Sequence, residues 1–159
     1  MNTPSGRDRI THMLARTASI DDVLAAWPAT AGALTELRSC LHDWLSARAW
    51  PKPAAQLIVL AVNEAATNVV EHAYGPGETS GRIEMYAWEH DDPQDADHRR
   101  VGVVVADTGE WQPGTPLRGR LGLALIRDLM LHHHVERTDR GTCVTFISHA
   151  VPALDGASG

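Results

Sequence analysis

The segment from residue 54 to residue 74 places the strongest constraint on the fold, because its apolar residues recur at helical spacing. At about 100° per residue, one stripe of the segment contains Ile58, Val62, Ala66, Val69 and Ala73. Pro51 and Pro53 precede it and suit a helix start, and Gly75-Pro76-Gly77 suits a helix end. The sequence therefore predicts an amphipathic helix whose stripe packs against a core.

Shorter patterns predict the remaining elements. Leucines at helical spacing predict a first helix over residues 31–49, and a short helix is expected over residues 121–130. Strands are expected at residues 23–28, 81–89, 100–106, 135–138 and 142–147, with loops at 90–98 and 110–120. Consecutive strands with short turns should pair antiparallel. The expected fold class is an α/β two-layer sandwich, with helices on one face of a mixed, mainly antiparallel sheet.

Size and charge indicate a single-domain protein that does not bind nucleic acid. The 159 residues suit one domain, expected at residues 21–150, after a flexible extension of residues 1–20 and before a loose tail of residues 151–159. The net charge is −6 and the 14 basic residues are scattered, which argues against nucleic-acid binding. No apolar run approaches the roughly 20 residues of a membrane span. Without a secretory signal or a disulfide framework, we expect a cytoplasmic protein.

The long helix carries a pair of polar residues that suits chemistry. Glu64 and Asn68 stand at i and i+4, so their side chains reach one point in space. Both are expected on the side opposite the apolar stripe. Leu57 and Leu60 lie on the same side, so that side is expected to be partly covered. An amide oxygen suits Mg²⁺, and a carboxylate suits the removal of a hydroxyl proton. The alternative is an ordinary solvated helix face.

Three further motifs follow in the chain. Asp107-Thr-Gly109 ends an apolar strand, where a carboxylate can accept a hydrogen bond from a ligand, although an Asp-x-Gly turn is also an ordinary strand end. Gly119 and Gly122 stand where a helix is expected to open, and free N–H groups there favour phosphate oxygens. The alternative is loop punctuation. Gly141-Thr142, taken alone, is a hairpin turn.

In their order and spacing, the four motifs resemble the boxes of the Bergerat-fold (GHKL) ATPases, which include gyrase B, histidine kinases and mismatch-repair ATPases. Residues 64–68 resemble the N-box Glu-x-x-x-Asn, and residues 107–109 resemble the Asp-x-Gly box. Residues 119–123 resemble the second glycine box, and residues 141–142 the last Gly-Thr. The resemblance covers about residues 23–148.

Within that superfamily the chain is most similar to the stand-alone anti-sigma-factor serine/threonine kinases of bacteria. The run from Leu60 to Gly75 is very like their N-box helix, and the run from Gly122 to Met130 is like the segment after their second glycine box. Histidine kinases usually carry a helix pair with a phosphoacceptor histidine before this domain. The residues before the N-box show no such pair.

The resemblance implies an ATP site with magnesium. The residues that it assigns to nucleotide binding are Asn68, Asp107, Gly109, Gly119, Leu121, Gly122, Leu123 and Thr142. Asp107, helped by Thr142, would bind the adenine amino group, and Asn68 would hold Mg²⁺ on the phosphates. Glu64 would be the base for an attacking serine hydroxyl. The implied partners are an anti-sigma antagonist of the STAS type and a sigma factor, and relatives are often homodimers.

One residue departs from the family pattern. Trp111 stands where the Asp-x-Gly box normally has a second glycine, which is expected to stiffen the hinge of the lid. Two alternatives stay open, and Trp111 motivates the first. The chain could be a nucleotide-binding or catalytically weak module that sequesters a protein partner, or the catalytic half of a split histidine kinase.

Overall fold

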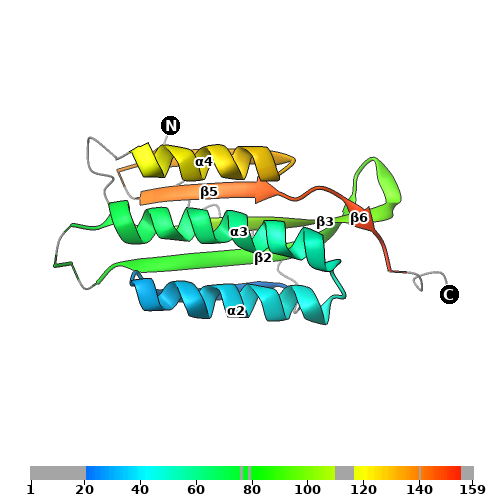
Figure 1. Cartoon of the computed structure of the whole chain (residues 1–159), viewed down its shortest axis with the longest axis horizontal. Coiled ribbons are helices and arrows are strands. Elements are labelled where there is room, and N and C mark those ends of the chain that lie inside the picture. The colour runs from blue at the N-terminus through cyan, green and yellow to red at the C-terminus, as the bar shows by residue number, and fades with distance from the viewer. Residues whose placement is uncertain (1–20, 76, 79, 110–116, 140, 155–159) are drawn as a thin grey trace, which may run out of the picture.

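The computed structural model describes residues 21–154 apart from 76, 79, 110–116 and 140, with side chains left out at 117–121 and 138. Its elements form one sheet with helices over one face, as expected (Figure 1). The helices are α2 (Ala31–Ala47), α3 (Lys52–Asn68), its π-helical continuation η1 (Val69–Ala73), and α4 (Leu117–Leu129). The strands are β1 (Val23–Pro28), β2 (Arg82–Asp92), β3 (Asp95–Ala106), β4 (His132–Thr138), β5 (Gly141–Ile147) and β6 (Val151–Pro152).

The sheet has the strand order β1-β2-β3-β5-β4, and β6 pairs with β3. Every pairing among the described strands is antiparallel. Strand β3 is therefore central, and its end at Ala106 lies beside the start of β5. That placement brings the residue after β3 next to the turn that precedes β5.

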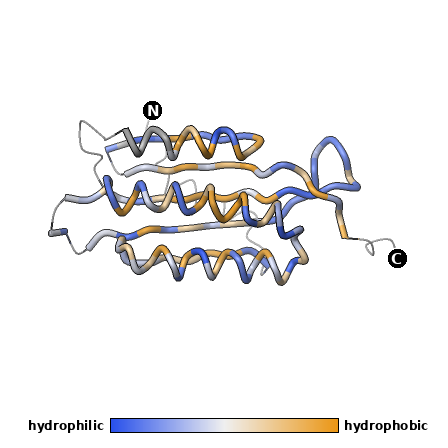
Figure 2. The backbone as a smooth tube through the Cα atoms, in the orientation of Figure 1, coloured by the Kyte–Doolittle hydropathy of each residue, from blue (hydrophilic) through white to orange (hydrophobic). Residues whose placement is uncertain are grey.

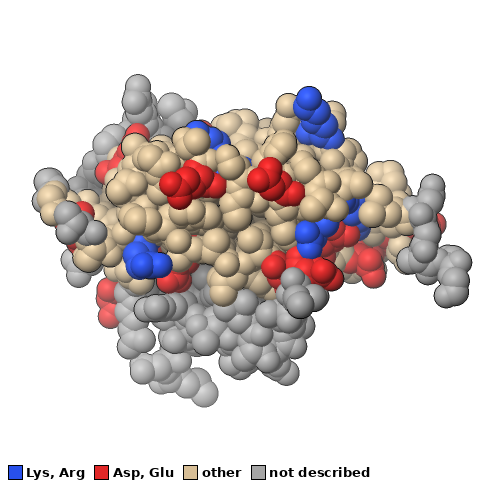
Figure 3. Space-filling view, turned by 90° about the horizontal axis from the view of Figure 1, so that it is seen from below, with Lys and Arg blue, Asp and Glu red and all other residues tan. Residues whose placement is uncertain are grey.

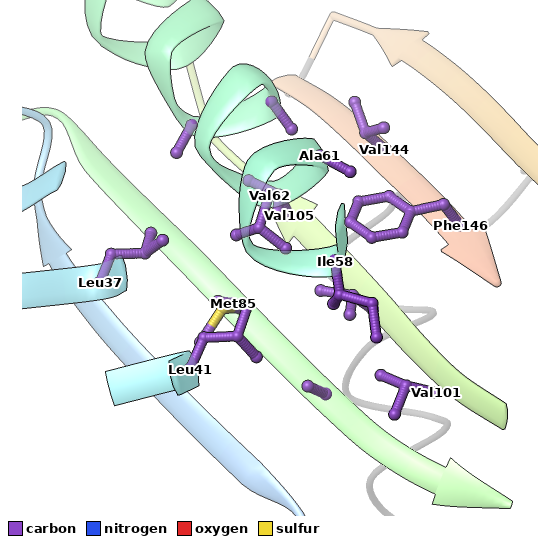
Figure 4. Close-up of a cluster of buried hydrophobic side chains, with 14 of the residues drawn as sticks. Leu37, Leu41, Ile58, Ala61, Val62, Met85, Val101, Val105, Val144 and Phe146 are labelled. Carbon is purple, nitrogen blue, oxygen red and sulfur yellow. The ribbon is translucent and has the colours of Figure 1, made fainter. Parts of the chain in front are cut away.

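The core lies between the helices and the sheet. Alternate residues of a strand face the same side, and Val101 and Val105 of β3 are buried beneath the helices together with Phe146 of β5 (Figure 4). Leu41 of α2 and Ile58 of α3 fill the opposite side of the same cluster. Figure 2 shows apolar and polar residues alternating along the helices, as expected for helices with one buried side.

Helix α3 is the middle helix of the layer, in contact with both α2 and α4. The stretch Lys52–Ala73 is long and apolar enough, by length and composition, to cross a membrane. In this fold its apolar stripe is used for packing, because Ile58, Val62 and Ala66 are each at most 1% exposed. The predicted core stripe of the long helix is thus confirmed.

The expected loop at residues 90–98 is wrong, because these residues extend β2 and β3 into one hairpin. His90 pairs with Arg100 and Asp91 with Arg99. The Arg100 guanidinium also lies 2.7 Å from the Asp92 carboxylate. The acidic residues of this segment indicated exposure to solvent, which led to the prediction of a loop. A strand can expose alternate side chains to solvent while its backbone stays hydrogen-bonded to its neighbour.

Helix boundaries differ from the prediction at two places. The long helix is α-helical from Lys52 only to Asn68, and the π turn η1 replaces its last residues. Helix α4 begins at Leu117, so residues 117–120 are helical and not part of a loop. Glycines suggested a later start, yet a single glycine costs a helix only about 1 kcal/mol.

The ends of the chain also need a correction. The tail was expected from residue 151, but Val151–Pro152 form β6, which pairs with His98 and Arg99 of β3. The expected extension of residues 1–20, and Trp111 with most of the expected loop, lie outside the described residues.

On the face seen in Figure 3, the basic side chains lie singly among acidic ones.

Phe146 tests the packing of the core. It is 1% exposed, so replacing it with alanine should lower the free energy of unfolding by about 3–5 kcal/mol through lost burial and a cavity. Leu154→Ala is the control, because Leu154 is 55% exposed and should cost roughly 0.5 kcal/mol or less. Urea unfolding measures both. A loss below about 1 kcal/mol for Phe146→Ala would contradict this core.

Candidate functional site

The carboxylate of Asp107 is buried at the end of β3, with 6% of the residue exposed. Its Oδ1 accepts hydrogen bonds from the Gly109 N–H at 2.9 Å and the Thr142 N–H at 3.3 Å. The backbone N–H of Asp107 donates to the Thr142 carbonyl at 3.0 Å. Its Oδ2 is buried and has no hydrogen-bond partner among the described residues. A buried acceptor left open in this way suits a donor on a ligand.

Burial also changes the acidity of this group. Desolvation raises the pKa of Asp107 to about 6, although the two backbone N–H groups act in the opposite direction. Above that pH the site carries a negative charge with one open oxygen. It then favours a ligand that offers an N–H or an amino group.

Two glycines let three backbone segments meet around Asp107. A Cβ at Gly109 would lie 1.8 Å from the carbonyl oxygen of Ala73, the last residue of η1. A Cβ at Gly141 would lie 2.0 Å from the Asp107 carbonyl oxygen, and Gly141 has a φ of +127°. Only glycine fits either position. The end of the N-box helix is thereby joined to the Asp-x-Gly turn and the β4–β5 turn.

The hydroxyl of Tyr74 ties the same turn to the sheet. It accepts the Thr108 N–H at 3.2 Å and the Arg82 N–H at 3.0 Å, and it donates to the Arg82 carbonyl at 2.7 Å. Its ring lies so close to Gly81 that a Cβ there would be 2.6 Å away. The motif analysis missed this positioning residue. The one sequence signal for it was its position, because Tyr74 directly follows the end of the helix that carries the N-box.

Glu64 and Asn68 lie together beneath α4. A Cβ at Gly122 would be 3.0 Å from Glu64 Oε2 and 3.5 Å from Asn68 Nδ2. Asn68 is 6% exposed, and its Nδ2 has no hydrogen-bond partner among the described residues. A half-turn of the amide presents Oδ1 to the same space. An unsatisfied buried amide beside a carboxylate fits the coordination of a hydrated cation.

The side of α3 that carries this pair was expected to be partly covered, because Leu57 and Leu60 lie on it too. Asn68 is indeed buried, by the approach of α4. Leu57 and Leu60 themselves are 42% and 39% exposed. Periodicity of one helix could not reveal α4, which arrives from a distant part of the chain.

The other predicted residues lie in or beside α4. Gly119 and Leu121 belong to its first turns, and Leu123 is partly buried against the core. Because α4 begins at Leu117, the N–H groups left open at its start are those of residues 117–120, earlier than expected. Thr142 is 5% exposed, and its N–H donates to the Asp107 carboxylate. Among the described residues, no three His, Cys, Asp or Glu side chains gather into a metal site.

The sequence of residues 27–148 matches the model of the histidine kinase-like ATPase domain. The match spans more than half of the chain, so the protein belongs to the histidine kinase-like ATPase domain family, the GHKL superfamily that its motifs resemble. No curated protein matches it.

Three solved structures are similar. The RsbU and RsbW domains of Rv1364c from Mycobacterium tuberculosis match with a TM-score of 0.61 and 24% identity, over 83% of this chain and 33% of that one. The blue-light activated histidine kinase EL346 of Erythrobacter litoralis gives 0.46 and 25% identity, over 62% and 31%. Its histidine kinase domain gives 0.48 and 20%, over 87% and 68%. The first match shows a shared fold, and this chain spans about a third of that protein's length.

Asp107 should make stability depend on pH. Between its ordinary pKa of 3.8 and its raised pKa of about 6, the folded state holds a proton that the unfolded state releases. Stability of the wild type should therefore fall across this window as pH rises, relative to Asp107→Asn, which cannot titrate. Urea unfolding between pH 4 and pH 8 measures the difference. Parallel curves for the two proteins would contradict the assignment.

Tyr74→Phe keeps the ring and removes its hydrogen bonds to Thr108 and Arg82. Amide exchange at Thr108 and Arg82 should become faster, because their N–H groups lose an acceptor. Tyr86→Phe is the control, since its hydroxyl donates to Asp22 instead. Exchange followed by NMR tests this, and unchanged rates in Tyr74→Phe would exclude a positioning role.

Proposed function

We propose that this protein is an ATP-dependent protein serine/threonine kinase that acts as an anti-sigma factor, with a STAS-type anti-sigma antagonist as its substrate. Membership of the family supports ATP binding. The observation that carries the proposal is the pairing of Glu64 and Asn68 under Gly122, joined through η1 to an Asp107 carboxylate with one open oxygen.

The adenine end of the site is assigned to Asp107. Its open Oδ2 accepts a hydrogen bond from the adenine amino group, and Thr142 stands beside it. Gly109 lets the turn pack against Ala73, and its N–H donates to Oδ1 of Asp107, which leaves Oδ2 for the adenine. Recognition by a single carboxylate oxygen favours adenine over guanine, whose carbonyl at the same ring position is an acceptor.

The phosphate end is assigned to Glu64, Asn68 and α4. Asn68 would hold Mg²⁺ on the phosphates, and the ion supplies charge neutralisation when bound. The first N–H groups of α4, together with Gly119 and Leu121, face the phosphates in this assignment. Glu64 accepts the proton of the substrate serine hydroxyl as that oxygen attacks the terminal phosphorus. The bond from this phosphorus to the bridging oxygen breaks, and ADP leaves.

The protein partners are proposed from two similarities. One structural relative carries an RsbW domain next to an RsbU domain, and the motif resemblance favours the stand-alone anti-sigma kinases. The proposed partners are therefore the antagonist and a sigma factor, in the cytoplasm, with this chain as a homodimer. Neither nucleic acid nor membrane is a proposed partner.

The second candidate is a binding module without turnover, and Trp111 is the feature that favours it. A bulky residue in place of a hinge glycine would slow lid movement while leaving adenine recognition intact. Such a protein would regulate by sequestering its partner.

Glu64→Gln separates the two candidates. A kinase should keep Mg-ATP binding and lose at least about 100-fold in phosphate transfer to the antagonist, because the base is removed. Glu71→Gln is the control, since the Glu71 side chain is 43% exposed and lies about two turns further along the helix. Radiolabel transfer that gives acid-stable phosphoserine measures the effect. Absence of transfer by the wild type would favour the binding module, and acid-labile phosphate would indicate a split histidine kinase.

Gly122→Ala separates activity from stability. Alanine favours a helix by up to about 1 kcal/mol over glycine, so the free energy of unfolding should not fall. The new methyl group would press on Glu64 Oε2, the end of a flexible side chain, and displace the base. We expect at least tenfold slower phosphate transfer at unchanged Mg-ATP affinity. A variant as active as the wild type would mean that Glu64 does not need this position.

A further inference from the structure

Two leucines on the middle helix are exposed to solvent. Leu57 and Leu60 of α3 are 42% and 39% exposed, although the apolar stripe of the same helix packs into the core. They stand three residues apart, so their side chains are neighbours on the helix surface. The other large apolar residues that are exposed in the described part of the chain lie elsewhere in the sequence, at Leu24, Leu131 and Leu154. Single exposed leucines are ordinary, whereas neighbouring ones on one side of a helix indicate a contact surface.

The same side of α3 carries the two residues proposed to act on the phosphates. At about 100° per residue, four side chains fall within an arc of about 80° around the helix axis: Leu57, Leu60, Glu64 and Asn68. We call these four residues the α3 stripe. Exposure falls along it, because the leucines are open to solvent, Glu64 is partly buried and Asn68 is 6% exposed beneath α4. The stripe therefore leads from solvent, past the proposed base, to the amide proposed to hold the metal ion.

Neighbouring helices hold the stripe on both sides. Helix α3 lies between α2 and α4 and contacts both of them (Figure 1). Arg38 of α2 donates a hydrogen bond to Asn63 Oδ1 at 2.7 Å, and Asn63 directly precedes Glu64 in the chain. On the other side, a Cβ at Gly122 of α4 would lie 3.0 Å from Glu64 Oε2. Because α4 covers that end of the stripe, a partner that reaches Glu64 along α3 passes over the two leucines.

The geometry of the helix gives the spacing that such a partner must match. An α-helix advances about 1.5 Å per residue, so Leu60 lies about 6 Å and Leu57 about 10.5 Å from Glu64 along the axis. An extended peptide advances about 3.3 Å per residue. A segment whose serine hydroxyl reaches Glu64 therefore places the residues two and three positions from that serine over the leucines. An apolar side chain at either position buries surface against them.

We propose that Leu57 and Leu60 bind the phosphoacceptor segment of the protein substrate, an extended stretch with an apolar side chain two or three residues from its serine. The inference rests on the proposed kinase function, with Glu64 as the base. The contact adds no chemical step. It places the serine oxygen beside Glu64, and it lowers the substrate concentration at which phosphate transfer is half-maximal.

Steady-state kinetics of a double variant test the proposal. Leu57→Gln combined with Leu60→Gln removes the apolar surface without placing a charge near Glu64, and glutamine favours a helix nearly as well as leucine. The matched control is Leu24→Gln, because Leu24 is 55% exposed and pairs with Tyr86 on the face of the sheet away from the helices. The probe is a purified STAS-domain protein that the wild type phosphorylates on serine.

The expected change is in KM alone. The KM for the STAS-domain protein should rise at least about tenfold in the double variant, while kcat and the affinity for Mg-ATP stay within about twofold of the wild type. The control variant should keep the wild-type KM. Leu60→Met should also keep it, because methionine preserves an apolar side chain at this position.

A change in the substrate gives a second readout. Replacing the apolar residue two or three positions from the phosphorylated serine with glutamine should raise KM about tenfold for the wild-type kinase. The same replacement should change KM by less than about twofold for the double variant, because that contact is already lost.

The outcomes separate this inference from the proposed function. Equal KM values for the wild type and the double variant, with phosphate transfer intact, would overturn the inference and leave the kinase function standing. A phosphorylated serine without an apolar residue two or three positions away would do the same. Loss of a dimer in the double variant, seen by light scattering at unchanged KM, would assign the leucines to a second copy. A wild type that phosphorylates no STAS-domain protein would refute the proposed function, and this inference with it.

Discussion

The Asp107 carboxylate, buried at the end of β3 and bonded through Oδ1 to the N–H groups of Gly109 and Thr142, is the interaction on which the site depends. It needs β3 and β5 side by side, because one donor comes from each side of that pairing. It also needs two glycines that admit neighbouring backbone. As a result, the Asp107 Oδ2 is buried with no hydrogen-bond partner among the described residues and can accept from a ligand. Burial also raises the pKa of the Asp107 carboxyl group to about 6.

The second half of the site depends on the helical layer. The π turn after Asn68 ends with Ala73 directly against Gly109, so the end of this helix packs on the Asp-x-Gly turn. On the other side, Gly122 lets α4 descend onto Glu64 and Asn68. The carboxylates of Asp107 and Glu64 are therefore held by one connected set of backbone contacts.

Sequence patterns predicted the layers, the strand pairing and the motif positions, because periodicity and turn residues report on local structure. These patterns did not predict features that depend on contacts between segments far apart in the chain. The burial of Asn68 depends on α4, and the role of Tyr74 depends on Thr108 and Arg82. The π turn η1 could not be told from an α-helix by the spacing of its apolar residues. The acidic hairpin of β2 and β3 was missed because its composition is that of a loop. The assignments of site residues to ATP came from the family resemblance.

The most direct test of the account is a calorimetric titration of Mg-ATP into the wild type, Asp107→Asn and Asp128→Asn at pH 8, where the Asp107 carboxylate is charged. Asp128 is an exposed acidic residue of α4 and serves as the control. The account predicts binding by the wild type and Asp128→Asn, and at least tenfold weaker binding by Asp107→Asn. Equal affinity in all three, or no binding by the wild type, would contradict the assignment of this site to a nucleotide.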